Sequence, residues 1–66
     1  MKEPTYDYRH NAYLAGKWHY TIDSESVLVT KDTADGGIES VNVYHYPNYT
    51  DAENAAYRMA RLQVNA

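Results

Sequence analysis

The clearest alternation of apolar and polar positions runs from Ile38 to Tyr46. Two sets of side chains alternate along it: Val41, Val43 and His45 on one side, and Ser40, Asn42, Tyr44 and Tyr46 on the other. A period of two is typical of a β-strand whose faces meet different surroundings. Pro47 and Asn48 end the pattern. The sequence therefore predicts a strand over residues 38–46.

Two shorter patterns precede this strand. Residues 27–31 form a β-rich run, and the loop 32–37 that follows it contains Asp-Gly-Gly, a hairpin signal. Residues 17–22 place Trp18, Tyr20 and Ile22 on one face, and residues 23–26 have the composition of a turn. The sequence thus predicts three antiparallel strands joined by short turns.

Residues 7–15 fit two structures. As a short helix they place Tyr6, His10, Tyr13 and Leu14 on one side, with Gly16 just past the end. As a strand paired with residues 17–22 across Ala15 and Gly16, they turn His10, Ala12 and Leu14 inward. Because Tyr and Asn are weak helix formers, we favour the strand.

The last segment, residues 50–64, has a helical pattern. Thr50 and Glu53 have the spacing of a capping box, and the acidic and basic residues are placed as the helix dipole prefers. One stripe gathers the small and apolar residues, together with one glutamine: Ala52, Ala55, Ala56, Met59, Leu62 and Gln63. Tyr57 lies off the stripe, where its ring either follows the helix flank or contacts a partner.

Together these elements predict an α+β fold, with an antiparallel sheet of three to four strands and a C-terminal helix packed on one face. We expect one small domain over residues 1–66, with an N-terminal segment (1–16), the strands (17–46) and the helix (50–64). Val41 and Val43 are expected to face the alanines of the helix. Tyr44 and Tyr46 then stand on the opposite face.

Tyrosine dominates the apolar composition. The chain has eight tyrosines, one tryptophan and no phenylalanine in 66 residues, and only ten Ile, Leu and Val residues. Some of the rings must therefore complete the core, and the rest are available for an interface, where tyrosine is enriched. A domain this small is one that a dimer or another partner helps to stabilise.

Several classes of chemistry find no support in the sequence. There is no cysteine, so disulfides and thiolate metal sites are excluded. The three histidines, His10, His19 and His45, have no ligand spacing, so we expect no metal and no cofactor. No serine lies beside a base, and we expect no enzymatic activity. Without an apolar membrane-length run or signal-peptide core, we expect a soluble, cytoplasmic protein that contacts no membrane.

Negative charge is concentrated in the middle of the chain. Residues 23–53 contain seven acidic residues and one lysine, whereas the whole chain has a net charge of −3. An acidic surface repels a phosphate backbone and favours a basic protein surface.

These observations lead to a first hypothesis, a small acidic protein-binding module. We interpret it as an inhibitor or modulator of the kind that phages encode, covering a basic surface of a larger host or defence protein. The expected apolar anchors are tyrosines, and the expected charged contacts are acidic: Tyr20, Tyr44, Tyr46 and Tyr57, with Glu25, Asp32, Asp35 and Glu39.

A second hypothesis is nucleic-acid binding. Three strands followed by a helix, with Trp18 in the first strand and Thr-Asp-Ala-Glu-Asn-Ala-Ala opening the helix, are similar in outline to the arm-binding domains of phage integrases. That resemblance covers residues 17–63 and implies DNA contacts from the sheet face opposite the helix. Aromatic rings on that face could also stack on single-stranded bases. The acidic strands and loops depart from the basic surface that such a domain needs.

A third possibility concerns the core alone. Tyr6, Tyr8 and Tyr13 could fold over Tyr44 and Tyr46 and bury them. The acidic turns at residues 23–26 and 32–36 are then the best candidates for partner contacts.

Overall fold

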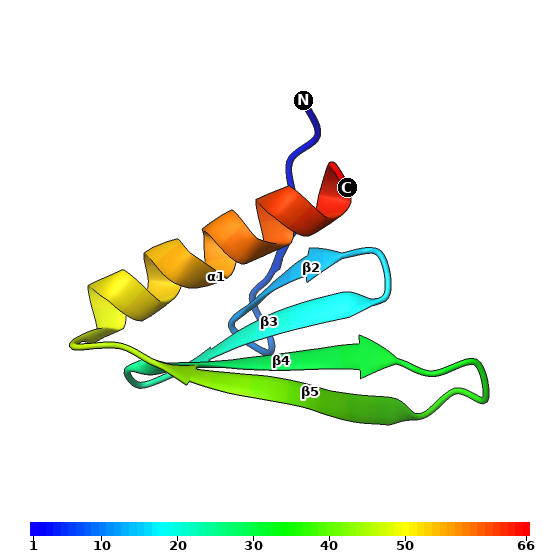
Figure 1. Cartoon of the computed structure of the whole chain (residues 1–66), viewed down its shortest axis with the longest axis horizontal. Coiled ribbons are helices and arrows are strands. Elements are labelled where there is room, and N and C mark those ends of the chain that lie inside the picture. Colours follow the sequence, from blue (N-terminus) through cyan, green and yellow to red (C-terminus); the bar gives the residue numbers. More distant parts are fainter.

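The computed structural model describes residues 1–66 as five strands followed by one helix (Figure 1). In chain order they are β1 (Thr5–Asp7), β2 (Ala12–Ala15), β3 (Trp18–Asp23), β4 (Ser26–Asp32), β5 (Ile38–His45) and α1 (Tyr49–Val64). The strands form one antiparallel sheet in the order β1-β2-β3-β4-β5, and α1 crosses one face of it. The predicted α+β class is confirmed, but the sheet has five strands rather than three to four.

The favoured interpretation of residues 7–15 as a strand is confirmed only for Ala12–Ala15, because residues 8–11 form the turn between β1 and β2. β2 pairs with β3, and Ala15 lies opposite Trp18 across a two-residue turn. Gly16 occupies that turn with a φ of +62°, a conformation that glycine adopts without a steric penalty. The extra strand β1 pairs with β2 and has only three residues. Three residues are too few to show an alternation.

The inward face of β2 differs from the prediction. Ala15 belongs to the buried core and Tyr13 packs against it, whereas His10 lies exposed in the turn before the strand. The register explains this, because Tyr13 lies opposite Tyr20, whose side chain faces α1. Ala12 is buried as well, but outside the core cluster under α1.

The helix begins one residue before its predicted start. Its N-cap is Asn48, whose side-chain oxygen accepts the Asp51 N–H at 2.9 Å, so Thr50 lies inside the first turn and is not the cap. Three alanines at a spacing of four are completely buried against the sheet: Ala52, Ala56 and Ala60. Leu62, predicted on this stripe, is 75% exposed. α1 is neither long enough nor apolar enough to cross a membrane.

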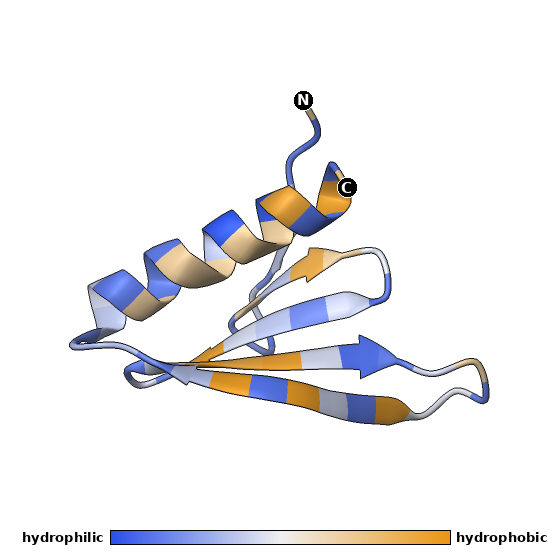
Figure 2. Cartoon of the chain, viewed as in Figure 1, coloured by the Kyte–Doolittle hydropathy of each residue, from blue (hydrophilic) through white to orange (hydrophobic).

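The core lies between the three alanines and the middle of the sheet. Its other members are Ala15, Tyr20, Ile22, Val27 and Val29. Because alanine side chains are short, α1 approaches the sheet closely over β2, β3 and β4. In Figure 2 the underside of α1, toward the sheet, is the more apolar one.

The predicted orientation of the last strand is wrong for Val43, Tyr44 and Tyr46, whereas Val41 faces the α1 side as predicted. Tyr44 lies opposite the fully buried Val27 and therefore faces α1, and Tyr46 also packs against the core. The register shifts between Val29 and Thr30, because β5 contains one extra residue there, a β-bulge. The bulge lets Val41 and Asn42 both turn toward the α1 side, while Val43 points to the far face. The apparent alternation of valines concealed it.

Candidate functional site

An open groove lies between α1 and β5, because α1 covers only part of the sheet. The helix packs on β2, β3 and β4, whereas all eight residues of β5 are exposed. Toward the C-terminal end of α1 the ribbon of β5 diverges from the helix (Figure 1). We call this space the α1–β5 groove; its volume is about 420 Å³. That size falls in the range of pockets that receive a ligand or a partner's side chain.

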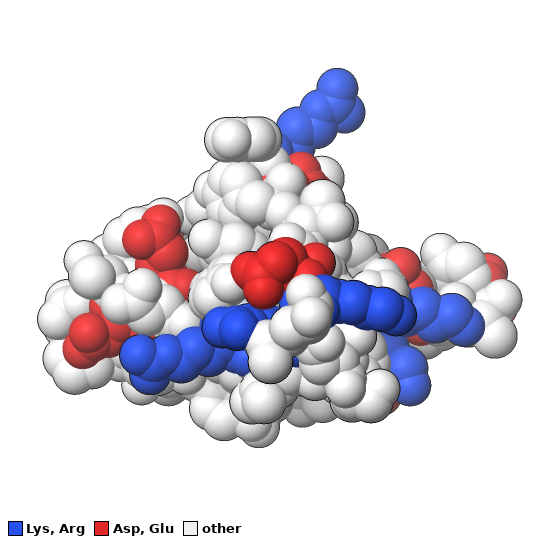
Figure 3. Space-filling view, turned by 90° about the horizontal axis from the view of Figure 1, so that it is seen from above, with Lys and Arg blue, Asp and Glu red and all other residues white.

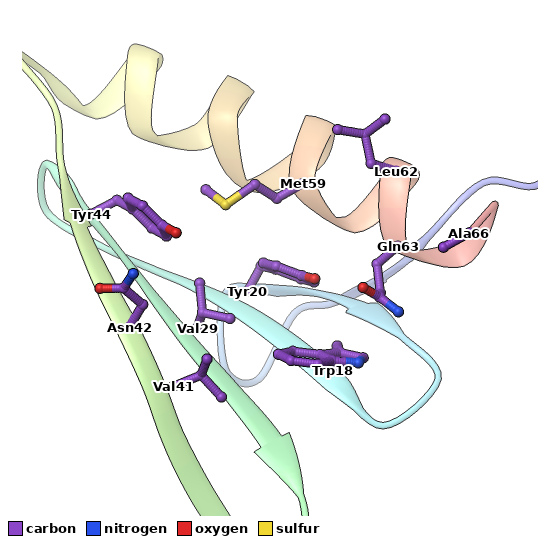
Figure 4. Close-up of a pocket in the computed structure, with 10 residues that line it drawn as sticks. All are labelled: Trp18, Tyr20, Val29, Val41, Asn42, Tyr44, Met59, Leu62, Gln63 and Ala66. Atoms are coloured by element: carbon purple, nitrogen blue, oxygen red, sulfur yellow. The ribbon is translucent and has the colours of Figure 1, made fainter.

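The lining of the groove is mostly apolar and comes from four elements. The floor is formed by Trp18 and Tyr20 of β3 and Val29 of β4 (Figure 4). The remaining lining residues belong to β5 and to the end of the helix: Val41, Asn42, Tyr44, Met59, Leu62, Gln63 and Ala66. The Met59 side chain points toward Tyr44, while Gln63 points toward Trp18.

Exposure rises from the floor of the groove to its rim. Tyr20 is 5% exposed, Tyr44 is 43% exposed and Leu62 is 75% exposed. Burial raises the pKa of the Tyr20 hydroxyl, and the nearby Tyr44 adds to the shift. The floor is thus part of the folded core, whereas the rim presents apolar side chains to solvent.

The helix wall is held in place by the N-terminal segment. The Asn65 side chain accepts the Lys2 backbone N–H at 2.9 Å and donates to the Lys2 carbonyl at 2.9 Å. Arg61 lies 3.5 Å from the Glu3 carboxylate. These contacts fix the last turn of α1, which carries part of the groove lining.

One cation lies beside the floor of the groove. The Lys31 ammonium is 5.2 Å from the centroid of the Trp18 ring, within the range of a cation–π contact. In the sheet register, Trp18 lies opposite Lys31, and Lys31 lies opposite Glu39. This row leads from the groove to the end of the β4–β5 hairpin.

The predicted acidic residues separate into two places. Asp32, Asp35 and Glu39 lie together at the β4–β5 hairpin, whereas Glu25 is exposed in the β3–β4 turn at the other end of these strands. The Asp32 carboxylate is hydrogen-bonded to His19 at 2.9 Å. The hydroxyl of Thr33 and the N–H of Gly37 donate to Asp35 and lower its pKa.

The helix side of the molecule has a mixed charge. Seen from this side, Lys and Arg form a broken band across the surface, and most Asp and Glu lie along one flank of the band (Figure 3). The acidic composition therefore does not produce a uniformly acidic face.

The predicted tyrosines also have different roles. Tyr20 is core, Tyr46 is half-buried against the core, and Tyr44 stands at the groove rim. Tyr57 packs edge-on against Tyr13, with ring centroids 5.5 Å apart. Its hydroxyl donates to the Glu3 carboxylate, and this bond raises the pKa of Tyr57. Only Tyr44 of the four belongs to the exposed rim of the groove.

The N-terminal tyrosines do not cover Tyr44 and Tyr46, contrary to the third possibility. Tyr6 packs against Tyr8 and Tyr13, with centroid distances of 4.8 Å and 5.1 Å. Together with Tyr57 these rings form a cluster at the β1–β2 side of the helix. The groove at the β5 side is left open.

Of the ten residues that line the groove, sequence reasoning predicted only Tyr20 and Tyr44 as contacts and missed the other eight. Val41 and Met59 were assigned to the core, Leu62 to the buried stripe of the helix, and Asn42 to the far face. The small size of the alanines could have predicted an open groove, because a helix with a narrow apolar face covers only part of a wide sheet. The bulge that turns Val41 toward the groove has no signature in the sequence.

The far face of the sheet has a different composition. The strand residues at its centre include aliphatic, hydroxyl and imidazole side chains: Leu14, His19, Thr21, Leu28, Thr30 and Val43. A shallow hollow there is bordered by His10, which bonds Asp7 at 2.7 Å, and by His19. No group of three or more His, Asp or Glu side chains is arranged to hold a metal ion.

Comparison with protein-family models, curated proteins and solved structures finds no match to this chain.

Proposed function

We propose that this chain is a protein-binding module that receives an apolar anchor of a larger protein in the α1–β5 groove. In this proposal it acts in the cytoplasm as an inhibitor or modulator, by covering part of the surface of its partner. The observation that carries the proposal is the rim of Val41, Tyr44 and Leu62, which are 45%, 43% and 75% exposed beside an aromatic floor. Contiguous exposed apolar side chains around a hollow are typical of interaction sites.

The chemistry of the groove suggests the kind of anchor. An aromatic, leucine or methionine side chain fits a lining of this size and apolar character. Asn42, Gln63 and the Tyr44 hydroxyl offer polar groups at its border that can orient the incoming segment. These groups favour one binding geometry over non-specific adhesion.

The charge next to the groove suggests a basic neighbour for that anchor. The β4–β5 hairpin end carries Asp32, Asp35 and Glu39 against Lys31, a net charge of −2. Exposed charges of this kind steer association more than they add affinity. We therefore expect a partner whose apolar anchor is flanked by lysine or arginine, and an association rate that falls as salt is added.

The geometry favours this function over nucleic-acid binding from the far sheet face. All tyrosines of the strands, and Trp18, lie on the α1 side or in the N-terminal cluster, so the far face has no aromatic platform for bases. The acidic hairpin adds repulsion of phosphates.

Site-specific photo-cross-linking in lysate of the source cells, or of their host, tests the proposal. A photoreactive amino acid replaces Leu62 at the groove rim or, as the matched control, Tyr8, which is 88% exposed in the β1–β2 turn. We expect a discrete cross-linked protein from position 62 that is absent from position 8. Tyr44→Ala should weaken binding of the purified partner by roughly 2 kcal/mol, as for an anchor in an interface.

Two results would contradict the proposal. One is a folded protein that forms no cross-link at position 62 beyond the control level. The other is a partner whose affinity is unchanged by Tyr44→Ala, because that partner would be using a different surface.

A further inference from the structure

The outer edge of β5 is unpaired and has little protection against pairing with another strand. β5 is the last strand of the sheet, its eight residues are all exposed, and it contains no proline and a single charge, Glu39. The opposite edge strand, β1, has only three residues and follows a proline. Proteins usually shorten, charge or cover an edge strand to prevent pairing, and only β1 is protected in that way.

The hydrogen bonds beside β5 define which of its backbone groups point outward. The Tyr46 N–H donates to the Glu25 carbonyl at 2.8 Å. Hydrogen-bonded pairs alternate along an antiparallel ladder, so Tyr44 and Asn42 exchange bonds with β4, whereas Val43 and His45 turn their backbone groups away from it.

The same reasoning applies on the other side of the bulge. The Thr33 N–H donates to the Gly37 carbonyl at 2.9 Å, which makes Lys31 and Glu39 the next bonded pair. Ile38 and Ser40 therefore point outward as well. Along β5 the outward residues are Ile38, Ser40, Val43 and His45.

The spacing of these four residues is two, three and two positions, and it reads the same in both directions. We propose that β5 pairs antiparallel with β5 of a second copy of this chain, Ile38 opposite His45 and Ser40 opposite Val43. The two-fold axis then passes between Val41 and Asn42. All four outward residues of each copy pair at once, giving eight backbone hydrogen bonds.

The bulge is what selects a second copy as the occupant. A regular strand offers outward groups at a constant spacing of two, so it can match the edge on only one side of the bulge. A second copy carries the same bulge at the matching position. The pairing also keeps residues of each sheet face on that face, so no side chain crosses the sheet.

The charges along β5 are compatible with this pairing. Glu39 lies opposite Tyr44 of the second copy, and the two Glu39 carboxylates fall near opposite ends of the paired strands. No like charges face each other, which is the condition that antiparallel pairing requires. In the single chain the Val43 N–H is held by the Asn42 side chain at 2.8 Å, and pairing replaces this bond with one to Ser40.

The size of the interface predicts a reversible dimer. A single pair of eight-residue strands buries less surface than a permanent interface needs, so the dimer should dissociate on dilution. Because the two-fold axis is perpendicular to the sheet, both helices lie on the same face. The two α1–β5 grooves then flank the paired strands. The proposed dimer goes beyond the proposed function and does not depend on it.

Amide hydrogen exchange of the full chain, measured by NMR across a dilution series, tests the register directly. Sedimentation velocity on the same samples gives the concentrations at which the dimer forms. At those concentrations we expect the amides of Ile38, Ser40, Val43 and His45 to become protected from exchange. The amides of Glu39, Asn42 and Tyr44, which bond to β4, should be protected at every concentration. A monomer at millimolar concentration, or a dimer that leaves the four outward amides unprotected, would overturn the proposal.

Ser40→Pro supplies a matched perturbation. It removes an outward N–H and no bond to β4, and proline is tolerated at such an edge position. We expect dimerisation to weaken at least tenfold, whereas the control Ser40→Thr, which keeps the N–H, should dimerise as the parent chain does. Leu62→Gln should leave dimerisation unchanged, so a failure of the groove and a failure of the β5 edge are distinguishable.

Discussion

Tyr20 and Tyr44 line the same groove, yet substitution of each by alanine should have very different consequences. A buried aromatic side chain removes roughly 200 Å² from water. With 5% and 43% of the two residues exposed, Tyr20 buries about 80 Å² more than Tyr44. At about 25 cal/mol per Å², Tyr20→Ala should lower the free energy of unfolding by about 2 kcal/mol more than Tyr44→Ala.

This difference is large for a chain of 66 residues. A domain of this length has a total stability of roughly 3–10 kcal/mol, and loss of a buried aromatic ring costs about 3–5 kcal/mol. Tyr20→Ala should therefore be marginally folded or unfolded, and Tyr44→Ala should remain folded with a reduced melting temperature.

Urea unfolding followed by far-UV circular dichroism measures both changes, and it avoids the fluorescence of Trp18, which lies in the same groove. Equal losses for the two variants would refute the reasoning, because the groove would then be closed over Tyr44 in solution. A Tyr44→Ala variant that is stable but binds its partner poorly would show that this ring serves the interface.

Three further predictions concern the core, the helix and the tyrosine hydroxyls. Ala56→Leu places three extra carbons at a completely buried position and should lower the free energy of unfolding in urea by about 1–3 kcal/mol. Ala55→Leu, at a partly exposed position, should lower it less. Equal effects would show that the buried alanines do not set the position of the helix on the sheet. Asn48→Ala removes the N-cap side chain and should lower the free energy of unfolding by about 1 kcal/mol, whereas the control Asn48→Asp keeps a capping oxygen. An Asn48→Ala variant with unchanged thermal stability would contradict the cap assignment. Burial raises the pKa of Tyr20 above the ordinary value of about 10, so the unfolded chain loses this proton first and stability should fall as the pH rises through 10. Tyr20→Phe should reduce that alkaline loss in a pH series of thermal unfolding, and an unchanged pH dependence would contradict the burial of the hydroxyl.

Residues with a strong local signal were placed correctly from the sequence. The alternation of Trp18, Tyr20 and Ile22 identified β3, and the Asp-Gly-Gly loop located the β4–β5 hairpin. The helix was located to within one residue at its start, although its cap is Asn48 rather than Thr50. In each case the preference of the local residues and the demands of the fold agree.

The errors arose where the decisive contact is distant in the sequence. The orientation of Tyr44 depends on its pairing with Val27 and on a bulge, neither of which the alternation along β5 reveals. Leu62 satisfied the helical period but lies past the part of the sheet that α1 covers. β1 forms because β2 offers it a partner.

The sequence by itself determined the three strands after Gly16, the helix, their order and the need for tyrosine in the core, because backbone preferences, turn residues and composition are local properties. Tertiary structure decided which rings are core and which are rim. The alanines of α1 seat the helix over the middle of the sheet, and β5 extends beyond its reach. The helix is thus narrower than the sheet it covers, and this difference leaves the groove open and β5 exposed. It depends on the packing of α1 against several strands, so no single segment of the chain reveals it.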